Sequence, residues 1–179
     1  MPFVLPTFPL QGELVSLQLF TAEDISERYV SWLNDLDVVR YSNQRLRAHS
    51  VESCQAYLAS FDGTDNLFIG IRRKEDNLLI GTMTAYISRH HGTADMGIMV
   101  GEKAVWGMGY GQQAWDTLLK ALLQQPAIRK VTAGTLECNA AMQRLAERSG
   151  MQFEGARKQQ EIVDGRAFDV RYFGRFRDV

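Results

Sequence analysis

Seven short segments of the chain are rich in apolar and β-branched residues and are bounded by polar or glycine-containing turns, which is the pattern of β-strands. From Ala94 to Val100, for example, the even-numbered residues form one apolar face, and Asp95 lies on the other. The polar turns Lys74–Asn77 and Val163–Arg166 each join two such segments and predict hairpins. The predicted strands are Glu13–Phe20, Leu67–Ile71, Leu78–Ile87, Ala94–Val100, Lys130–Leu136, Met151–Ile162 and Phe168–Phe176.

Four other segments repeat apolar residues every three or four positions, as an amphipathic helix does. Three of them follow a residue that can cap a helix, namely Thr21, Ser50 or Asn139. The fourth opens from a glycine-rich loop and ends before Pro126. Residues 41–47, between the first two helices, are polar and without period, so we expect a loop there. Residues 1–10 contain three prolines and predict an irregular arm.

The elements follow one another in the order β-α-α-β-β-β-α-β-α-β-β. This order predicts an α+β fold with a mixed, mostly antiparallel sheet of about seven strands, flanking helices, and one β-α-β crossover in its centre. The chain has 179 residues, which is enough for one domain with a proper core and cramped for two. We therefore expect residues 1–179 to form a single domain.

Charge and composition exclude several function classes. Twenty Lys and Arg residues are balanced by twenty-one Asp and Glu residues, so no nucleic-acid partner is expected. No apolar run approaches the roughly 20 residues of a membrane helix, and the N-terminus does not resemble a signal peptide, so we expect a cytoplasmic protein with no membrane partner. The two cysteines form no disulfide framework or zinc pattern, and the adjacent His90 and His91 would point to opposite faces of a strand. No metal site is predicted.

The chemically most informative stretch is Trp106-Gly107-Met108-Gly109-Tyr110-Gly111-Gln112, which follows a strand and opens a helix. Its three alternating glycines leave backbone N–H groups unshielded. The first turn of the helix adds N–H groups that have no partner within the helix, together with the positive end of the helix dipole. This combination predicts a site for a phosphate or pyrophosphate. Its spacing differs from the G-x-G-x-x-G pattern of dinucleotide-binding folds.

Taken together, these residues resemble the GNAT superfamily of N-acetyltransferases, which use acetyl-coenzyme A. The resemblance runs from about Glu13 to Phe176. Gly109 and Gly111 match the second half of the superfamily's loop pattern, whereas Trp106 stands where Gln or Arg is usual. Trp-Gly-x-Gly-Tyr-Gly is similar to the Rim-type subgroup (ribosomal-protein N-terminal acetyltransferase-like), as is the helix from Asn139 to Gly150.

The resemblance implies how the cofactor is held. The strand that contains Asp95–Val100 would splay away from its neighbour and free backbone groups for the pantetheine amides. The glycine loop would wrap the pyrophosphate, and Asn139 would contact the cofactor arm. The residues implied in acetyl-CoA binding are Ile98, Met99, Val100, Trp106, Gly107, Met108, Gly109, Tyr110, Gly111, Gln112 and Asn139.

Acetyl transfer to an amine needs a neutral amine and a proton source for the leaving thiolate. Asp95 lies where some members of the superfamily carry a base-like Glu, and Glu137 is a second candidate. We expect both carboxylates to approach the gap where the amine meets the thioester, although either could be an ordinary solvated residue. The positions that match the superfamily's acidic Tyr and the subgroup's Ser are Ala146 and Met142, so no general acid is identified.

The resemblance therefore implies an acetyl-CoA-dependent N-acetyltransferase without a metal, in which a primary amine attacks the thioester directly. The implied acceptor is a protein N-terminus or a small amine, and an amino sugar nucleotide is the alternative. A homodimer is one assembly open to such a protein. From a different class comes a non-catalytic module that binds coenzyme A or a nucleotide, which the missing Tyr and Ser would favour.

Overall fold

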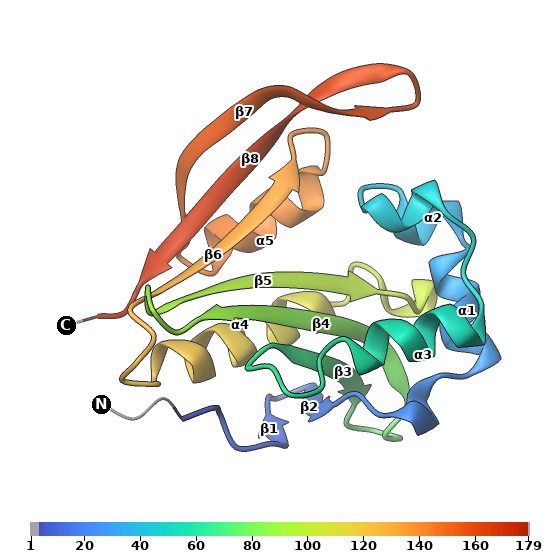
Figure 1. Ribbon diagram of the computed structural model, residues 1–179, viewed down its shortest axis with the longest axis horizontal. Coiled ribbons are helices and arrows are strands. Elements are labelled where there is room, and N and C mark those ends of the chain that lie inside the picture. Colours follow the sequence, from blue (N-terminus) through green and yellow to red (C-terminus); the bar gives the residue numbers. More distant parts are fainter. Residues whose placement is uncertain (1–3, 179) are drawn as a thin grey trace.

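The computed structural model describes residues 4–178 and contains one mixed sheet with helices on both faces (Figure 1). The eight strands lie in the order β1-β2-β3-β4-β5-β6-β8-β7, and β5 and β6 are the parallel pair. This confirms the predicted α+β fold, with one strand more than the seven expected. The strands are β1 Leu10–Gln11, β2 Val15–Leu19, β3 Leu67–Arg73, β4 Leu79–Ser88, β5 Thr93–Val100, β6 Lys130–Leu136, β7 Gln152–Val163 and β8 Arg166–Phe176.

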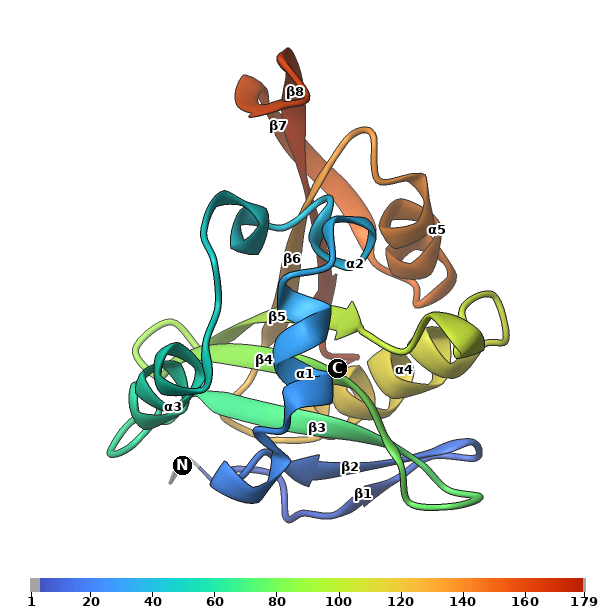
Figure 2. The ribbon, with the colours of Figure 1, turned by 90° about the vertical axis from the view of Figure 1, so that its right-hand side faces the viewer.

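Helices α4 and α5 lie on one face of the sheet, and α1 and α3 lie on the other (Figure 2). On one face, α4 buries Trp115 and its leucines against β2, β5 and β6, and α5 packs beside it. On the other face, α1 and α3 enclose an aromatic cluster built around Phe20, Tyr29 and Phe68. The helices are α1 Glu27–Leu33, α2 Leu36–Val39, α3 Val51–Ala59, α4 Tyr110–Leu123 and α5 Ala140–Arg148, with short 3-10 turns η1 Ala22–Asp24, η2 Asn43–Leu46 and η3 Lys103–Val105.

The N-terminal third differs in detail from the prediction. Thr21 begins only the turn η1, in which the Asp24 carboxylate accepts the Thr21 N–H at 2.9 Å. The helix itself starts later, where the Ser26 side chain accepts the N–H of Tyr29 at 3.2 Å. The expected loop at residues 41–47 contains η2, and α2 precedes it. Of the predicted arm, residues 1–3 lie outside the described residues, residues 4–9 form no regular element, and Leu10 pairs in β1.

The two C-terminal strands form a long hairpin that rises beyond the rest of the sheet (Figure 1). Its turn at Asp164 and Gly165 has left-handed backbone conformations at both residues, with φ of 49° and 76°, as the Asp-Gly pair predicts. A bulge interrupts β7, because Arg157 pairs with Val170 but Glu161 pairs with Phe168.

Candidate active site: a cofactor cleft and an acceptor pocket

The strands β5 and β6 run together for only three residue pairs and then separate. The pairs are Thr93 with Lys130, Ala94 with Val131, and Asp95 with Thr132. On its other edge, β5 remains paired with β4 up to Val100. A splay between these strands, which the resemblance implied, is therefore present at the end of β5 that leads into the glycine loop.

Ile98 and Val100 direct their backbone groups into this splay. In an antiparallel pair, alternate residues point their N–H and C=O toward the partner strand. The N–H of Gly101 donates to Ile80 of β4 at 3.0 Å, and this alternation makes Met99 the next residue whose backbone faces β4. Of the three backbone positions predicted on β5, Ile98 and Val100 thus face the gap, whereas Met99 faces the neighbouring strand.

The glycine loop has the open geometry expected of an anion site. Gly107 and Gly109 have left-handed φ values of 75° and 88°, and a Cβ on either would meet no atom within 4 Å. Gly109 is the N-cap of α4 and has no side chain to satisfy the first N–H groups of that helix. The first helical bond runs from the Gln113 N–H to the Gly109 carbonyl at 3.0 Å. The N–H groups of Tyr110, Gly111 and Gln112 thus have no partner within the helix.

Two side chains of the loop have structural roles of their own. The Trp106 indole Nε1 donates to the Val100 carbonyl at 2.9 Å, which ties the loop to the end of β5. The Gln112 amide donates to the Ser149 hydroxyl at 2.7 Å and to the Asp116 carboxylate at 3.2 Å. Gln112 therefore offers its backbone rather than its side chain to the splay. The Met108 side chain is exposed, and that of Tyr110 packs partly against the core.

Asn139 follows β6 and caps α5, so it lies on the far side of the splay from β5. Its side-chain carbonyl accepts the N–H of Met142 at 3.2 Å. The predicted capping role is thus present in the structure. Ala146 is fully buried in the core, and Met142 is half-buried beside it, so neither position supplies a proton donor.

We expect Asn139→Ala to lower the free energy of unfolding by about 1 kcal/mol, because the first turn of α5 loses its cap. If Asn139 also contacts the cofactor, the Michaelis constant for acetyl-CoA will rise in the same variant. Thermal unfolding and initial rates measure the two effects separately. Asn139→Asp retains a capping oxygen and is the control, and a stability loss with unchanged kinetics would leave only the capping role.

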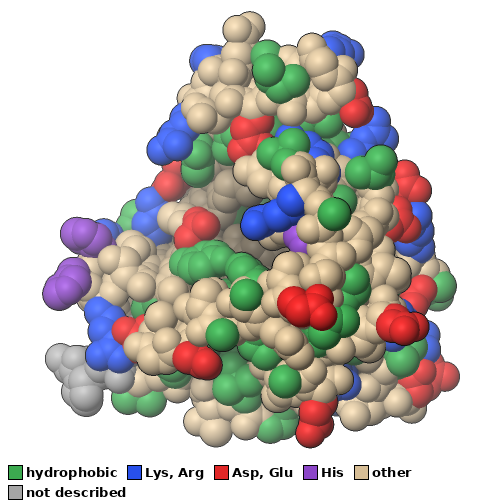
Figure 3. All heavy atoms as spheres, turned by 45° about the vertical axis from the view of Figure 1, so that its right-hand side comes forward, with side chains coloured by type: hydrophobic (Ala, Val, Ile, Leu, Met, Phe, Trp, Pro, Cys, Tyr) green, Lys and Arg blue, Asp and Glu red, His purple; other side chains and the backbone are tan. Residues whose placement is uncertain are grey.

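A pocket of about 290 Å³ lies on the opposite face of the sheet from α4, between the hairpin and the segment of α2 and η2. The space-filling view shows the surface hollowed between the hairpin and the body of the molecule (Figure 3). Its polar lining consists mainly of tyrosines and carboxylates, namely Tyr41, Asn43, Tyr86, Asp95, Glu161 and Tyr172. Among the described residues, no Lys or Arg lines this pocket.

Asp95 lies on the wall of this pocket, at the last residue pair before β5 and β6 separate. Its carboxylate Oδ1 accepts a hydrogen bond from the Thr132 hydroxyl at 2.6 Å. The carboxylate contacts solvent in the pocket, yet burial among the surrounding protein atoms raises the pKa of Asp95, and the Thr132 hydrogen bond opposes this rise. The predicted candidate therefore has a carboxylate suited to accept a proton near the splay.

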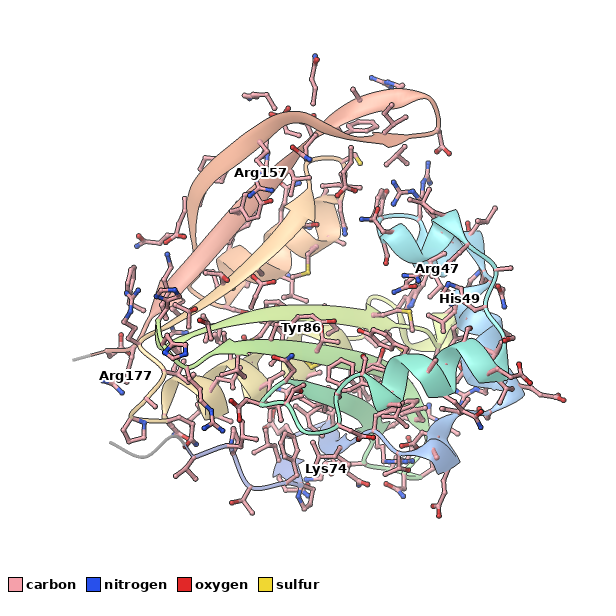
Figure 4. All side chains as sticks on the ribbon, in the orientation of Figure 1. Arg47, His49, Lys74, Tyr86, Arg157 and Arg177 are labelled. Carbon is pink, nitrogen blue, oxygen red and sulfur yellow. The ribbon has the colours of Figure 1, made fainter. Side chains whose placement is uncertain are left out.

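Tyr86 is the direct cross-strand neighbour of Asp95 and lies on the same face. It projects from the sheet below the hairpin, where Arg157 lies, and Arg47 approaches the same region from the end of η2 (Figure 4). The Tyr86 hydroxyl contacts that of Tyr57 at 2.9 Å, which holds its ring in place. Burial, followed by this contact, raises the pKa of Tyr57 well above its usual value.

Glu137 does not reach this pocket, which corrects the expectation that both carboxylates approach the same gap. Glu137 directly follows β6, and its neighbour Arg171 donates to Gln143 of α5 at 2.8 Å, so Glu137 lies on the face covered by α5. Its Oε1 accepts the N–H of Asp169 at 3.0 Å, and Arg171 approaches its other oxygen at 3.9 Å. Glu137 thus holds β8 in place.

Asp169 in turn pins the bulge of β7. Its carboxylate accepts the N–H of Gln159 at 2.9 Å and the Lys158 ammonium at 2.7 Å. Gln159 has a left-handed φ of 48°, which is strained for a residue with a Cβ. Because the bulge inserts two residues, Glu161 takes the position opposite Phe168 and enters the pocket lining.

Thr132 and Glu161 are site residues that the sequence patterns did not identify. Tyr86 could have been placed opposite Asp95 from the short connection between the predicted strands Leu78–Ile87 and Ala94–Val100. The contact of Thr132 depends on a parallel pairing across the whole of α4, and the place of Glu161 depends on the bulge. No local sequence pattern indicates the contact of Thr132 or the position of Glu161.

A larger hollow of about 1100 Å³ lies beside the C-terminal halves of α4 and α5 and the end of β8. None of the residues predicted for catalysis or cofactor binding lines it. Within residues 4–178, no three His, Cys, Asp or Glu side chains are grouped to hold a metal ion. In the same part of the chain, no helix has the length and apolar character needed to cross a membrane.

Comparison with solved structures shows the same fold in several acetyltransferases. A GNAT-family acetyltransferase from Bacillus anthracis has a TM-score of 0.80 at 19% identity, and the match covers 94% of this chain and 98% of the other. The acetyl transferase from Salmonella typhimurium that modifies the N-terminal serine of ribosomal protein L7/L12 has a TM-score of 0.79 at 18% identity, covering 95% and 98%. Spermidine N-acetyltransferase from Vibrio cholerae, in complex with CoA and spermine, has a TM-score of 0.81 at 15% identity, covering 92% and 96%.

No curated protein sequence matches this chain closely enough to count as a relative. At the level of sequence families, the acetyltransferase (GNAT) domain matches residues 15–152, which include the splayed strands, the glycine loop and α5. The resemblance stated from the motifs is thereby confirmed. The chain belongs to the acetyltransferase (GNAT) domain family and is an acetyl-CoA-dependent N-acetyltransferase.

Proposed function

We propose that the acceptor is a primary amine at the end of a slender flexible chain, either a protein N-terminus or a small amine, and that it enters the pocket beside Asp95. The observation that carries this proposal is the position of Asp95. It lines the pocket on one side of the sheet and also occupies the last residue pair before the strands open into the splay. An amine held there would lie next to a thioester in the splay.

Different residues of the splay bind different parts of acetyl-CoA. The N–H groups at the start of α4 and of the glycine loop bind the pyrophosphate, because they combine unpaired donors with the positive end of the helix dipole. The pantetheine amides take the place of a β6 partner and pair with the backbone groups of Ile98 and the N–H of Val100. Trp106 keeps the loop next to Val100, and Asn139 borders the opposite side.

Asp95 accepts one proton from the acceptor's ammonium group, directly or through a water, and leaves a neutral amine. Acetyl-CoA supplies the acyl thioester: the C–N bond forms, the C–S bond breaks, and the second amine proton passes to the departing sulfur. One proton in all is released to solvent from Asp95. The chain therefore needs only one side-chain base, and the absence of a Tyr at Ala146 does not prevent turnover.

The shape and polarity of the pocket favour small or terminal amines. A volume of about 290 Å³ is at the lower end for ligand sites, which favours a small or narrow acceptor group. Two arginines bridge from the segment of α2 and η2 to the hairpin tip at one side of the pocket. Arg45 donates to the Ile162 carbonyl at 3.0 Å, and Arg40 lies 3.7 Å from Asp164. An amino sugar nucleotide would need room for a sugar, a diphosphate and a nucleoside, which is more than this volume offers.

Two of the similar structures are consistent with this class of acceptor. The Salmonella protein modifies an N-terminal serine, which supports the Rim-type assignment, and the Vibrio protein acts on spermidine. A cytoplasmic location and a homodimeric assembly stay predictions, and light scattering of the purified protein measures the second.

Release of free thiol from acetyl-CoA, measured against a panel of amines, tests the proposed function. The panel contains short peptides with a free α-amine, the same peptides blocked at the N-terminus but carrying a lysine, small aliphatic amines, and an amino sugar nucleotide. We expect turnover with the free α-amines or the small amines. Turnover with the sugar nucleotide alone would assign the alternative acceptor, and tight acetyl-CoA binding without any turnover would favour the non-catalytic module.

A further inference from the structure

We propose that Thr132 is a positioning residue for proton transfer, whose hydroxyl holds one oxygen of the Asp95 carboxylate so that the other faces the acceptor amine. This inference rests on the proposed function, in which Asp95 accepts the amine proton. Thr132 itself touches neither substrate in this proposal. It acts through Asp95.

The pairing of β5 and β6 places the two side chains together. Asp95 and Thr132 are directly opposite each other in a parallel pair, so their side chains share a face. This pair is the last one before the strands separate. The Thr132 hydroxyl lies 2.6 Å from Asp95 Oδ1 and 3.4 Å from the Ala94 carbonyl oxygen. A hydroxyl carries a single proton, and the much shorter distance assigns it to the carboxylate.

Within residues 4–178, Thr132 is the one side chain that donates a hydrogen bond to Asp95, and no ion pair involves this carboxylate. The titratable groups that share its pocket are Tyr86 from β4, Glu161 from β7, Tyr172 from β8 and Tyr41 from the segment before η2. Tyr86 is engaged with Tyr57, and Arg45 lies 4.0 Å from Glu161. The orientation of the Asp95 carboxylate therefore depends on Thr132.

The hydrogen bond has two consequences for the reaction. With Oδ1 occupied, Oδ2 is the oxygen left to accept the proton, so the carboxylate presents one fixed acceptor to the amine or to an intervening water. The proton moves from the ammonium nitrogen to Oδ2, and no other bond changes in this step. The bond also stabilises the charged form of Asp95 against the effect of burial. Without it, Asp95 would hold a proton up to a higher pH.

The test compares Thr132→Val, which has nearly the same shape and no hydroxyl, with Thr132→Ser, which keeps the donor. We expect Thr132→Val to reduce kcat/KM by about 10-fold to 100-fold, the range for loss of a hydrogen bond to a charged group. The acidic limb of the pH profile should move to higher pH, because the carboxylate loses a group that favours its ionised form. Thr132→Ser should restore most of the rate and the original midpoint, and acetyl-CoA affinity should be unchanged throughout.

The matched control is Thr93→Val, which makes the same substitution on β5, two residues before Asp95 and outside the pocket lining. It should leave the pH profile as it is. A wild-type rate and midpoint in Thr132→Val would overturn the proposal, and Thr132→Ala gives the same readout if the valine variant does not fold. Asp95→Asn separates the two levels of inference. If it retains full rate, the proposed base is wrong, and if it loses rate while Thr132→Val does not, only the positioning role fails.

Discussion

Acetyl-CoA binding should fall by at least about 100-fold when Gly111 is replaced by Asp, because like charges brought together in a binding site cost several kcal/mol. Gly111 lies in the first turn of α4, two residues after the N-cap Gly109, and faces Val100 at the end of β5. A Cβ there would approach Val100 at 3.4 Å and Leu145 at 4.0 Å, which are ordinary contacts. The helix tolerates the side chain, but its carboxylate would lie among the N–H groups that we assign to the pyrophosphate.

Gly111→Asn is the control for this variant, since asparagine has the same shape as aspartate and no charge. Isothermal titration calorimetry with acetyl-CoA gives both affinities, and thermal unfolding shows whether each variant is folded. We expect the asparagine variant to bind at least 10-fold more tightly than the aspartate variant. Equal and undiminished affinities in two folded variants would mean that the cofactor's phosphates bind elsewhere.

The second large effect concerns catalysis. Asp95→Asn preserves the size of the side chain and its contact with Thr132 but removes the proton acceptor, so kcat/KM should fall on the order of 10² to 10⁴-fold. In the unsubstituted protein, kcat/KM should rise with pH as Asp95 loses its proton, and burial places this limb above the pH at which an ordinary carboxyl ionises. In Asp95→Asn this limb should disappear, and the limb that belongs to the amine acceptor should remain.

Glu137→Gln is the matched control. It removes the other carboxylate that the sequence suggested as a base, and this carboxylate lies on the opposite face of the sheet. The glutamine keeps an oxygen for the N–H of Asp169, so we expect an unchanged rate and only a small loss of stability. Calorimetry with acetyl-CoA should give wild-type affinity for both variants. If Glu137→Gln loses the rate and Asp95→Asn does not, the assignment of the base is reversed.

Many elements of this fold could be predicted because their causes are local. The hairpin turn at Asp164 and Gly165 follows from two neighbouring residues that accept left-handed backbone angles. Helix α5 starts after Asn139 because the side chain of that residue caps the helix, and α4 starts directly after Gly109, the second of the three glycines. The error at Thr21 has a local cause as well. Thr21 and Ser26 are both able to cap, and the Asp24 side chain turns the first of them into a separate 3-10 turn.

The candidate site was predicted in part, and the missing part is non-local. The glycine loop, Asn139 and Asp95 could each be recognised from the residues next to them in the sequence. The partner of Asp95 could not, because Thr132 lies across a parallel pairing that α4 separates by more than thirty residues of chain. The carboxylate of Glu161 reaches the pocket only because two extra residues in β7 shift its register.

The sequence by itself determined most of the strands and helices, the glycine loop that opens α4 and the family to which the chain belongs. The elements and the loop depend on residue spacing within short segments, and the family depends on the order of such motifs along the chain. The tertiary structure decided where β5 and β6 separate, and hence which backbone groups face the splay. It also decided that Asp95 and Glu137 lie on opposite faces of the sheet, because the face of a residue depends on its register with a strand that is distant in the chain. A shift of one residue in that register would place both carboxylates on the same face, and no local pattern records it.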